Sequence, residues 1–368
     1  RTELFTHIQI HCLPYKMKIL HVITSLRTGG AEHLMVDLLP ELKKMGNEVD
    51  LLVFDGTRTP FYEQAEAMGI KIHSLAIGEN VYSPKHIFRL CRFIRQYDVI
   101  HTHNTACQLF VPIAKCLTFG GAKLVTTEHS ANNRRRGKWY FKIADKWMYS
   151  RYEKIICIAD QTKQNLENHI GKKKIIITIY NGVNTANFLK PIKEVTNTQN
   201  FIITMIAAFR EGKDQDTLIR AMADLPDNYT LQIVGDGPRR PILEKLAEGK
   251  NVEFLGVRTD IPDILNSTDI VVLSSHWEGL SLSSIEGMAS GRPFIASDVD
   301  GLHEMVNGAG VLFPDGDHVA LASAIRSLCE NPEKYKAVAE RCQTRAKDYD
   351  ISKMAVGYNT VYQEITNE

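Results

Sequence analysis

The 368-residue sequence has few of the features that mark disulfide-rich, membrane-spanning or nucleic-acid-binding proteins. Its seven cysteines are an odd number with no Cys-x-x-Cys pair, so we expect neither a disulfide framework nor a zinc site. No apolar run approaches the roughly 20 residues of a membrane-spanning helix. The formal net charge is only +1, which gives no overall attraction to nucleic acid. These absences predict a cytoplasmic protein without a nucleic-acid partner.

The sequence also lacks the glycine fingerprint of a nicotinamide dinucleotide site. The turn at 28–32 (TGGAE) and the segment 234–240 (VGDGPRR) both miss the G-x-G-x-x-G spacing, which disfavours a dehydrogenase. Gly29 and Gly30 nevertheless follow the first apolar run directly. They would let a ligand approach the backbone just before a helix begins.

Short runs rich in Val and Ile alternate with longer helix-like segments. The runs mostly do not alternate with polar residues, which is typical of strands buried on both faces and therefore of parallel sheets flanked by helices. They fall into two series, which predict two doubly wound α/β domains. The first comprises Ile19–Ile23, Val49–Phe54, Val99–His101, Leu124–Thr127, Ile155–Ile158 and Ile175–Ile179, and the second comprises Phe201–Ile206, Leu231–Val234, Val252–Leu255, Ile270–Leu273, Phe294–Ala296 and Val311–Phe313.

The break between the series is expected within 181–199, which contains an Asn-Gly turn signal, a proline and many polar residues. Met17 directly precedes the first clean strand, so the fold is expected to begin there. The predicted organisation is an extension outside the fold (1–16), a first domain (17–184), a linker (185–199), a second domain (200–345) and a C-terminal helix that can return to the first domain (346–368).

The strongest motif spans 276–297. Glu278 is expected just before a helix that starts near Leu280, with Ser281 in its first turn and Glu286 about two turns on. The start of a helix offers unpaired N–H groups to a phosphate, and Gly279 permits close approach of a ligand. Carboxylates accept hydrogen bonds from sugar hydroxyls. The alternative is that acidic residues here simply stabilise the helix dipole.

A second motif, 207–222, places Arg210 and Lys213 in a loop between a strand and a helix. Two cations in such a loop can bind a diphosphate, Arg through a planar fork and Lys as a point charge. The alternative is a pair of solvated loop cations.

Histidines follow two strands of the first series. His129 comes just after one strand, where ligands of parallel sheets bind, and His101 and His103 end another. Buried structural roles are the alternative for each, and a metal site formed by all three is a further one. We interpret three Asp-x-Asp strings as chance occurrences and predict no obligatory metal; they are Asp214–Asp216, Asp298–Asp300 and Asp315–Asp317.

The segment 134–154 carries eight cationic and two anionic side chains. Trp139, Ile143 and Trp147 recur at four-residue spacing and would form one stripe of a helix. A basic and aromatic helix suits an anionic membrane surface or a phosphorylated lipid. A core-packing helix with a solvated basic face explains the pattern equally well.

Taken together, these motifs resemble the retaining glycosyltransferases of family 4, which share the GT-B fold: two Rossmann-like domains facing each other across a cleft. The resemblance covers nearly all of 17–368. It rests on Gly29 and Gly30, on FREGKDQDTLIRAM, VGDGP and FLGVRTDIPD, and most specifically on Glu278-x7-Glu286 followed by GRPFIASDVDGLHEMV.

The resemblance implies acceptor binding in 17–184 and nucleotide-sugar binding in 200–345. The family usually has a glycine before the motif arginine, where this sequence has Ala208-Phe209, and we expect Phe209 to narrow the cleft. The implied roles are the donor ribose for Glu286, the transferred sugar for Glu278 and His129, the diphosphate for Arg210 and Lys213, the base for Val257 and Arg258, and the donor phosphate for Gly30.

The resulting hypothesis is a metal-independent, hexosyltransferase-like retaining enzyme. It would move a sugar from a nucleoside-diphosphate sugar, with UDP favoured, to a glycan or lipid-linked acceptor in polysaccharide or glycoconjugate biosynthesis. No cofactor beyond the nucleotide-sugar substrate is expected. The segment 134–154 would allow peripheral contact with the inner face of the membrane. The alternatives are a sugar-nucleotide 2-epimerase on the same fold and a non-catalytic nucleotide-sugar-binding protein.

Overall fold

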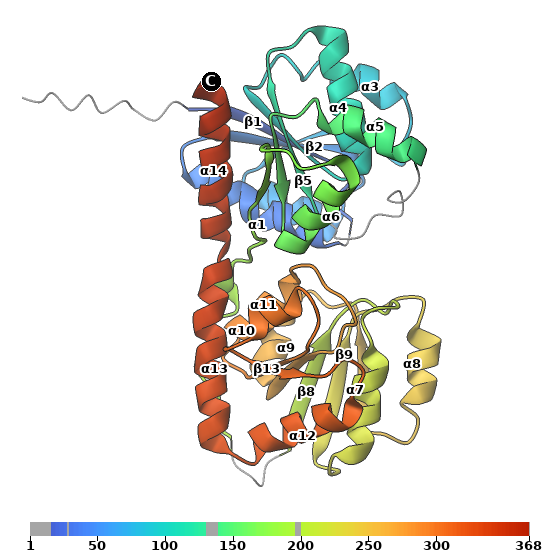
Figure 1. Cartoon of the computed structure of the whole chain (residues 1–368), viewed down its shortest axis with the longest axis vertical. Helices are drawn as coiled ribbons and strands as arrows, with labels where there is room; N and C mark the ends of the chain where they lie inside the picture. Colours follow the sequence, from blue (N-terminus) through green and yellow to red (C-terminus); the bar gives the residue numbers. More distant parts are fainter. Residues whose placement is uncertain (1–15, 28, 130–138, 196–199, 368) are drawn as a thin grey trace, which may run out of the picture.

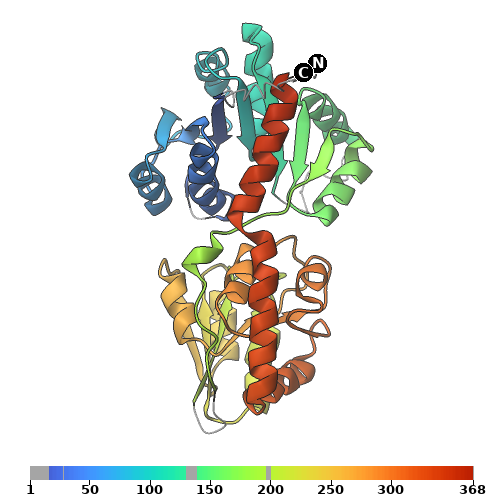
Figure 2. The same ribbon diagram turned by 90° about the vertical axis from the view of Figure 1, so that its left-hand side faces the viewer.

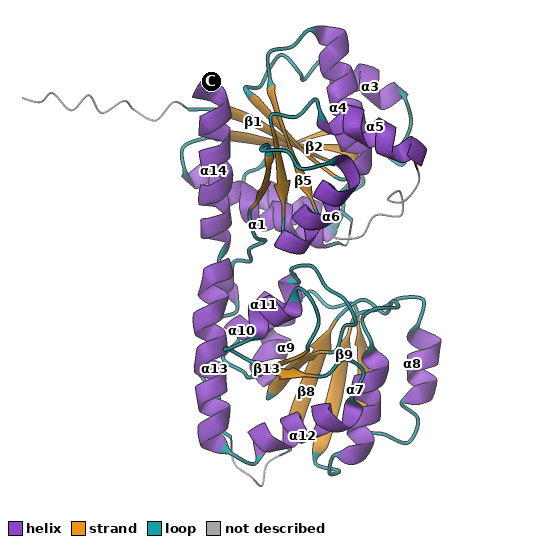
Figure 3. Cartoon of the chain, in the orientation of Figure 1, coloured by secondary structure: helices purple, strands orange, loops and turns teal. Residues whose placement is uncertain are grey.

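The computed structural model describes residues 16–27, 29–129, 139–195 and 200–367. All but Lys16 of the predicted extension 1–16 lies outside these residues. The described chain folds into two α/β units, each with a parallel sheet between layers of helices (Figures 1 and 3). This confirms the predicted fold class.

The first unit contains a seven-stranded sheet in the order β3-β2-β1-β4-β5-β6-β7, with every neighbouring pair parallel. Its strands are β1 (Lys18–Ile23), β2 (Glu48–Asp55), β3 (Lys71–Ala76), β4 (Val99–His103), β5 (Lys123–Glu128), β6 (Lys154–Cys157) and β7 (Ile176–Thr178). Its helices are α1 (Gly30–Lys44), α2 (Pro60–Ala67), α3 (Lys85–Leu90), α4 (Thr105–Thr118), α5 (Trp139–Tyr149) and α6 (Asp160–Ile170).

The second unit contains a six-stranded sheet in the order β10-β9-β8-β11-β12-β13, also parallel throughout. Its strands are β8 (Phe201–Ile206), β9 (Tyr229–Val234), β10 (Val252–Gly256), β11 (Ile270–Leu273), β12 (Phe294–Ser297) and β13 (Val311–Phe313). Its helices are α7 (Gln215–Ala221), α8 (Arg240–Leu246), α9 (Ile261–Ser267), α10 (Leu282–Ala289), α11 (Leu302–Val306), α12 (His318–Cys329) and α13 (Pro332–Ala346).

The last helix, α14 (Ile351–Asn367), packs against α1 of the first unit, whereas α13 packs against α10 of the second. Figure 2 shows the two helices following each other along one side of the molecule. Seven buried side chains of α14, among them Tyr358 and Tyr362, belong to the core on one face of the first sheet. The end of the chain therefore completes the first unit.

Strand order reverses beside β1 and β4 in the first sheet and beside β8 and β11 in the second. In open parallel sheets, ligands bind at the carboxyl ends of the strands at such a reversal. We therefore expect a ligand-binding site at the loops that follow β1, β4, β5, β8 and β11.

Candidate active site at the strand ends of both domains

The loop after β8 is held against the loop after β11. Gly212 has φ +92°, and its carbonyl accepts a 2.9 Å hydrogen bond from the backbone N–H of His276. A Cβ on Gly212 would lie 2.4 Å from the indole ring of Trp277, so only glycine fits this contact. Phe209 of the same loop is fully buried and meets Phe254 edge to face, so our expectation that it narrows the cleft is wrong.

This packing brings Lys213 and Glu278 together. The Lys213 ammonium forms an ion pair with Glu278 Oε1, which also accepts a 3.1 Å hydrogen bond from Ser275 Oγ. Arg210 lies exposed in the same loop, and no side-chain partner for it exists among the described residues. One of the two predicted cations thus contacts the predicted carboxylate, while the other faces solvent.

The helix behind this pair is α10, which begins at Leu282, two residues later than predicted. Ser281 precedes it with extended backbone, and no side chain caps the helix. The first amides of α10 therefore lack an intrahelical acceptor and are available to an anion. Gly301, at φ +85°, packs against the carbonyls of Glu278 and Gly279, where a Cβ would approach to 2.4 Å.

Glu286 lies on α10 with 6% of its surface exposed. Burial raises the pKa of its carboxyl from 4.5 to about 7, and nearby His33 opposes this shift. His33 Nδ1 of α1 stands 3.8 Å from Glu286 Oε1. A Cβ on Gly30 would lie 3.9 Å from Leu282 Cδ1. The starts of α1 and α10 therefore meet between the two domains, with Gly30 at the contact.

Three residues of this region were not predicted. His33 lies one turn into α1 after Gly30, and Trp277 directly precedes Glu278; their positions beside the motifs were the signal available. His276 also belongs here, because its Nδ1 is 2.7 Å from Asp315 and its Nε2 is 3.7 Å from Asp214. Two of the three Asp-x-Asp strings therefore approach one histidine, from opposite sides of its ring.

The residues implied for the base, Val257 and Arg258, lie on the loop after β10, two strands away from β8. Val257 is 63% exposed, and Arg258 pairs with Asp260 through two hydrogen bonds of 2.7 and 2.5 Å. Neither contacts Glu278 or Glu286 among the interactions of the described residues.

A pocket of about 320 Å³ opens at the carboxyl ends of β1, β4 and β5 in the first domain. His129 lines it beside Glu128, whose Oε1 accepts hydrogen bonds from Gln108 (2.6 Å) and Tyr149 (2.5 Å). Asn104 also lines it, with an unusual φ of +68° and a 3.0 Å hydrogen bond to Thr24. The remaining lining residues are Val81, Tyr82, Thr105, Ala106 and Thr127.

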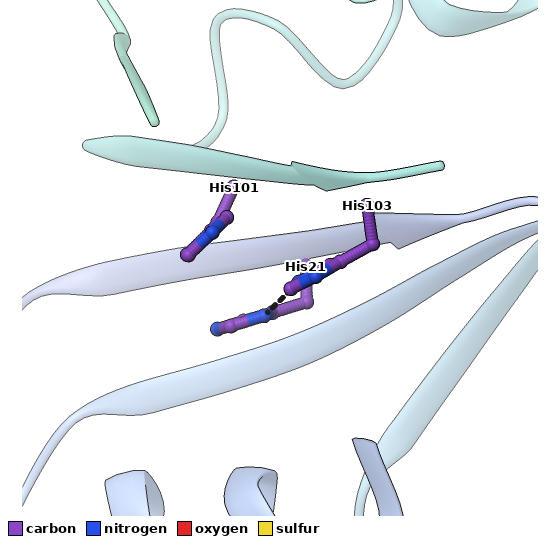
Figure 4. A group of neighbouring side chains, drawn as sticks. All are labelled: His21, His101 and His103. Atoms are coloured by element: carbon purple, nitrogen blue, oxygen red, sulfur yellow. Dashed lines mark hydrogen bonds between the residues drawn. The ribbon is translucent and has the colours of Figure 1, made fainter. Parts of the chain in front are cut away.

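His101 and His103 do not line this pocket. Both are completely buried in the sheet, where they stack with His21 of β1 (Figure 4). His21 escaped prediction because its partners lie some 80 residues away in the sequence.

Residues 134–138 of the basic segment lie outside the described chain. In α5, Met148 and Tyr149 are buried, whereas Ile143 is 63% and Trp147 39% exposed. The Arg151 guanidinium lies over the Trp147 ring at 5.2 Å. Ile143 and Trp147 of the predicted stripe thus face solvent and do not pack into the core. The Trp139 side chain lies outside the described part of the structure. No helix in the described part of the chain is long and apolar enough to cross a lipid bilayer.

Two parallel-sheet α/β domains that meet at the starts of α1 and α10 form the GT-B fold. The family model described as "Glycosyltransferase Family 4" matches residues 28–187, and that described as "Glycosyl transferases group 1" matches 200–331. The chain belongs to glycosyltransferase family 4.

Known proteins match along most of the chain. An uncharacterised glycosyltransferase of Methanocaldococcus jannaschii is 27% identical, covering 92% of this chain and 95% of its own length. An Escherichia coli UDP-Gal:alpha-D-GlcNAc-diphosphoundecaprenol alpha-1,3-galactosyltransferase is 26% identical, covering 78% and 80%. The crystal structure of Anabaena HepE with UDP-glucose superposes with a TM-score of 0.81 at 21% identity, covering 95% of this chain and all of that one.

Proposed function

We propose that this glycosyltransferase transfers a sugar from a UDP-sugar to a glycan or lipid-linked acceptor, with retention of anomeric configuration. One observation carries the proposal: the Lys213–Glu278 pair stands before the uncapped start of α10, directly opposite the start of α1. A nucleotide diphosphate placed there would meet an ammonium group and free backbone amides at once.

In this proposal the diphosphate lies between Lys213, Arg210 and the first amides of α10. Lys213 has three N–H donors, so it can keep Glu278 while it binds a phosphate oxygen. Arg210 has no side-chain partner to give up among the described residues. These groups would neutralise the leaving nucleoside diphosphate as its charge develops, with no metal required. Such preorganised donors are worth about 10²–10³ in rate each.

The two carboxylates would bind hydroxyl groups. Glu286 would accept hydrogen bonds from the ribose, and Glu278 from the transferred sugar. His129 of the first domain would face the same transferred sugar. Val257 and Arg258 would border the base, with Gly29 and Gly30 admitting the phosphates closely from the first domain. We favour UDP as the nucleotide, because the HepE structure contains UDP-glucose and the E. coli relative is named for UDP-Gal.

The acceptor would bind in the first domain, in the pocket beside His129. Its lining of hydroxyl and amide groups from Thr24, Asn104 and Gln108 suits an acceptor sugar rich in hydroxyls. The E. coli relative is named for a diphosphoundecaprenol-linked acceptor. The exposed stripe of α5, Ile143 with Trp147, would bring such a lipid acceptor to the protein at a membrane surface.

A thermal-shift panel of UDP, GDP, ADP and their sugars tests the donor. The shift grows with [L]/Kd, so UDP and UDP-sugars should stabilise the protein most. Lys213→Met should abolish the shift, while Lys245→Met, an exposed lysine of α8, should retain it. A larger response to GDP or ADP would contradict the choice of base. An equal thermal shift in Lys213→Met and Lys245→Met would contradict the placement of the donor at Lys213.

The stereochemical outcome is tested on the product. The anomeric proton coupling in NMR should show the configuration of the donor sugar. An inverted product would refute retention. Conversion of the donor without a glycosylated acceptor would instead indicate an epimerase or hydrolase.

A further inference from the structure

A row of hydrogen-bonded histidine rings runs through the first sheet to the pocket. His21 Nδ1 is 2.9 Å from His103 Nε2, and His103 Nδ1 is 2.9 Å from His129 Nε2 (Figure 4 shows the first of these contacts). The sheet explains the meeting: His101 and His103 project from the same face of β4, and His21 of β1 stands beside His101 in the parallel register.

The row continues on its far side to α14. His21 Nε2 lies 3.3 Å from the Tyr362 hydroxyl, which is 2.5 Å from His101 Nδ1. His101 Nε2 lies 2.8 Å from Thr127 Oγ1, itself 2.8 Å from the Tyr358 hydroxyl. A single chain of seven polar groups thus connects the last helix to His129.

The imidazoles of this chain are neutral near pH 7. Burial lowers the pKa of His21 to about 3 and that of His129 to about 4, and it holds the pKa values of His101 and His103 well below the usual 6.5. A neutral imidazole has one N–H and one bare nitrogen. Each ring therefore donates at one end and accepts at the other, so the whole chain has a direction.

The buried end selects this direction. Tyr358 is fully buried, and among the described residues Thr127 is the single hydrogen-bond partner of its hydroxyl. If donors point toward the pocket, Tyr358 donates to Thr127 and every buried proton has an acceptor. In the reverse direction the Tyr358 proton has none, and a buried unsatisfied donor is costly. His129 is partly exposed and lines the pocket, so its free nitrogen can meet water or a ligand in either case.

The ring arrangement favours this chain over a metal site. One nitrogen each of His21, His101 and His103 lies within 4.8 Å of the others, a spacing that would admit an ion. The rings of His21 and His103 are nearly parallel, at 12°, with their centroids 5.2 Å apart and their facing nitrogens 2.9 Å apart. This separation fits one proton shared between the two nitrogens, whereas an ion bound between them at about 2.0–2.1 Å from each would hold them about 4 Å apart.

We propose that His103 is a positioning residue, which donates from Nδ1 to His129 Nε2 and fixes His129 as the Nδ1–H tautomer. His129 then offers the pocket an uncharged N–H donor of set direction. This matches an oxygen of the donor sugar or of the leaving phosphate. The inference rests on the proposed function, which places His129 at the transferred sugar.

Nitrogen-15 NMR of histidine-labelled protein tests the tautomer directly. The wild type should show protonated Nδ1 and bare Nε2 at His129. In His103→Leu the ring is no longer held, and both His129 nitrogens should show averaged shifts. His103→Asn, whose amide can take the place of Nδ1–H, should restore the wild-type pattern. His86→Leu is the matched control, a fully buried histidine on α3 outside the chain, and should change nothing at His129.

Kinetics give the second readout. His103→Leu should lower kcat about tenfold, roughly the value of one hydrogen bond, while KM for the donor stays within about twofold. His103→Asn should recover most of the loss. Equal loss in the Leu, Asn and His86→Leu variants would mean general destabilisation and would overturn the positioning role.

The outcomes separate this inference from the proposed function. An Nε2–H tautomer of His129 in the wild-type protein would overturn the proposed hydrogen-bonded row, whatever the activity. So would a stoichiometric metal ion that His21→Leu removes. If the Nδ1–H tautomer is found but His129→Ala leaves kcat unchanged, the hydrogen-bonded row is confirmed and the role proposed for His129 in the reaction is contradicted.

Discussion

If Glu286 binds the donor ribose as we propose, donor binding should strengthen as pH rises, because the ionised carboxylate is the form that accepts hydrogen bonds from the ribose hydroxyls. Burial raises the pKa of this carboxyl from 4.5 to about 7, a shift equivalent to about 3 kcal/mol. In the free protein the group is therefore half protonated near neutrality. Ribose hydroxyls donating to the carboxylate favour the ionised form and lower its pKa in the complex. Binding should consequently release a proton.

The size of the effect follows from the titration. About one molecule in eleven has ionised Glu286 one pH unit below the midpoint, and about ten in eleven one unit above it. The Kd for a UDP-sugar should therefore be about tenfold higher at about pH 6 than at about pH 8. A UDP-sugar is the right probe, because its diphosphate is a diester and does not titrate in this range, unlike the terminal phosphate of UDP.

Folding stability should follow the opposite trend. The folded pKa of Glu286 lies above that of the unfolded chain, so the unfolded chain ionises first as pH rises. The stability associated with this group is fully present below about pH 4.5 and is lost as pH rises through about 7. Ligand-free protein should thus lose stability over the range in which it gains donor affinity, and Glu286→Gln should remove both trends.

Calorimetric titration from about pH 5.5 to about 8.5 measures the affinity, and two buffers of different ionisation enthalpy measure the proton release. Glu248→Gln, which changes an exposed carboxylate in the turn after α8, is the control and should keep the wild-type slope. His33→Ala should move the midpoint to higher pH, because His33 holds the pKa of Glu286 down. A Kd that does not vary with pH, or a slope that survives in Glu286→Gln, would refute the reasoning.

Three further predictions concern the loops proposed to bind the donor and the exposed residues Ile143 and Trp147 of α5. Lys213→Met should lower kcat/KM by about 10²–10³ in steady-state assays, and Lys213→Arg, which keeps the charge, should lose less; near-wild-type turnover in Lys213→Met would contradict its role. Gly212→Ala should lower Tm and weaken UDP-sugar binding together, because its Cβ would lie 2.4 Å from the Trp277 ring, and Trp277→Ala should relieve the clash in the double variant; additive losses would argue against this contact. Ile143→Glu combined with Trp147→Glu should abolish sedimentation with anionic vesicles and leave UDP-sugar affinity unchanged, whereas vesicle binding that persists would exclude α5 as the contact.

The sequence predicts the sheets well where strands are buried on both faces, because such strands form continuous Val and Ile runs. β3 escapes prediction because it is an edge strand with intermediate burial, and its sequence, KIHSLA, mixes polar and apolar residues. The position of α10 was predictable to within two residues. The loop between β11 and α10 is short, and Glu278 and Gly279 lie within it. The start of α10 and the spacing of Glu278 and Glu286 therefore depend on neighbouring residues alone.

Contacts between distant segments are what the sequence could not supply. Phe209 directly precedes a motif arginine, and nothing local shows that its ring turns into the core toward Phe254 while Arg210 stays in solvent. The pairing of His33 with Glu286 depends on how the two domains face each other. Sequence spacing does not encode that arrangement.

The histidine chain shows the same limit more sharply. Residues i and i+2 of a strand share a face, so His101 and His103 were predictable as neighbours. Their partners come from β1 and α14, about 80 and 260 residues away. Strand order sets the first partner and the return of α14 sets the second. The last helix thus supplies hydroxyl groups to the network behind the pocket as well as apolar surface to the core, so shortening the chain before Tyr358 should disturb His129 even where the sheet still folds.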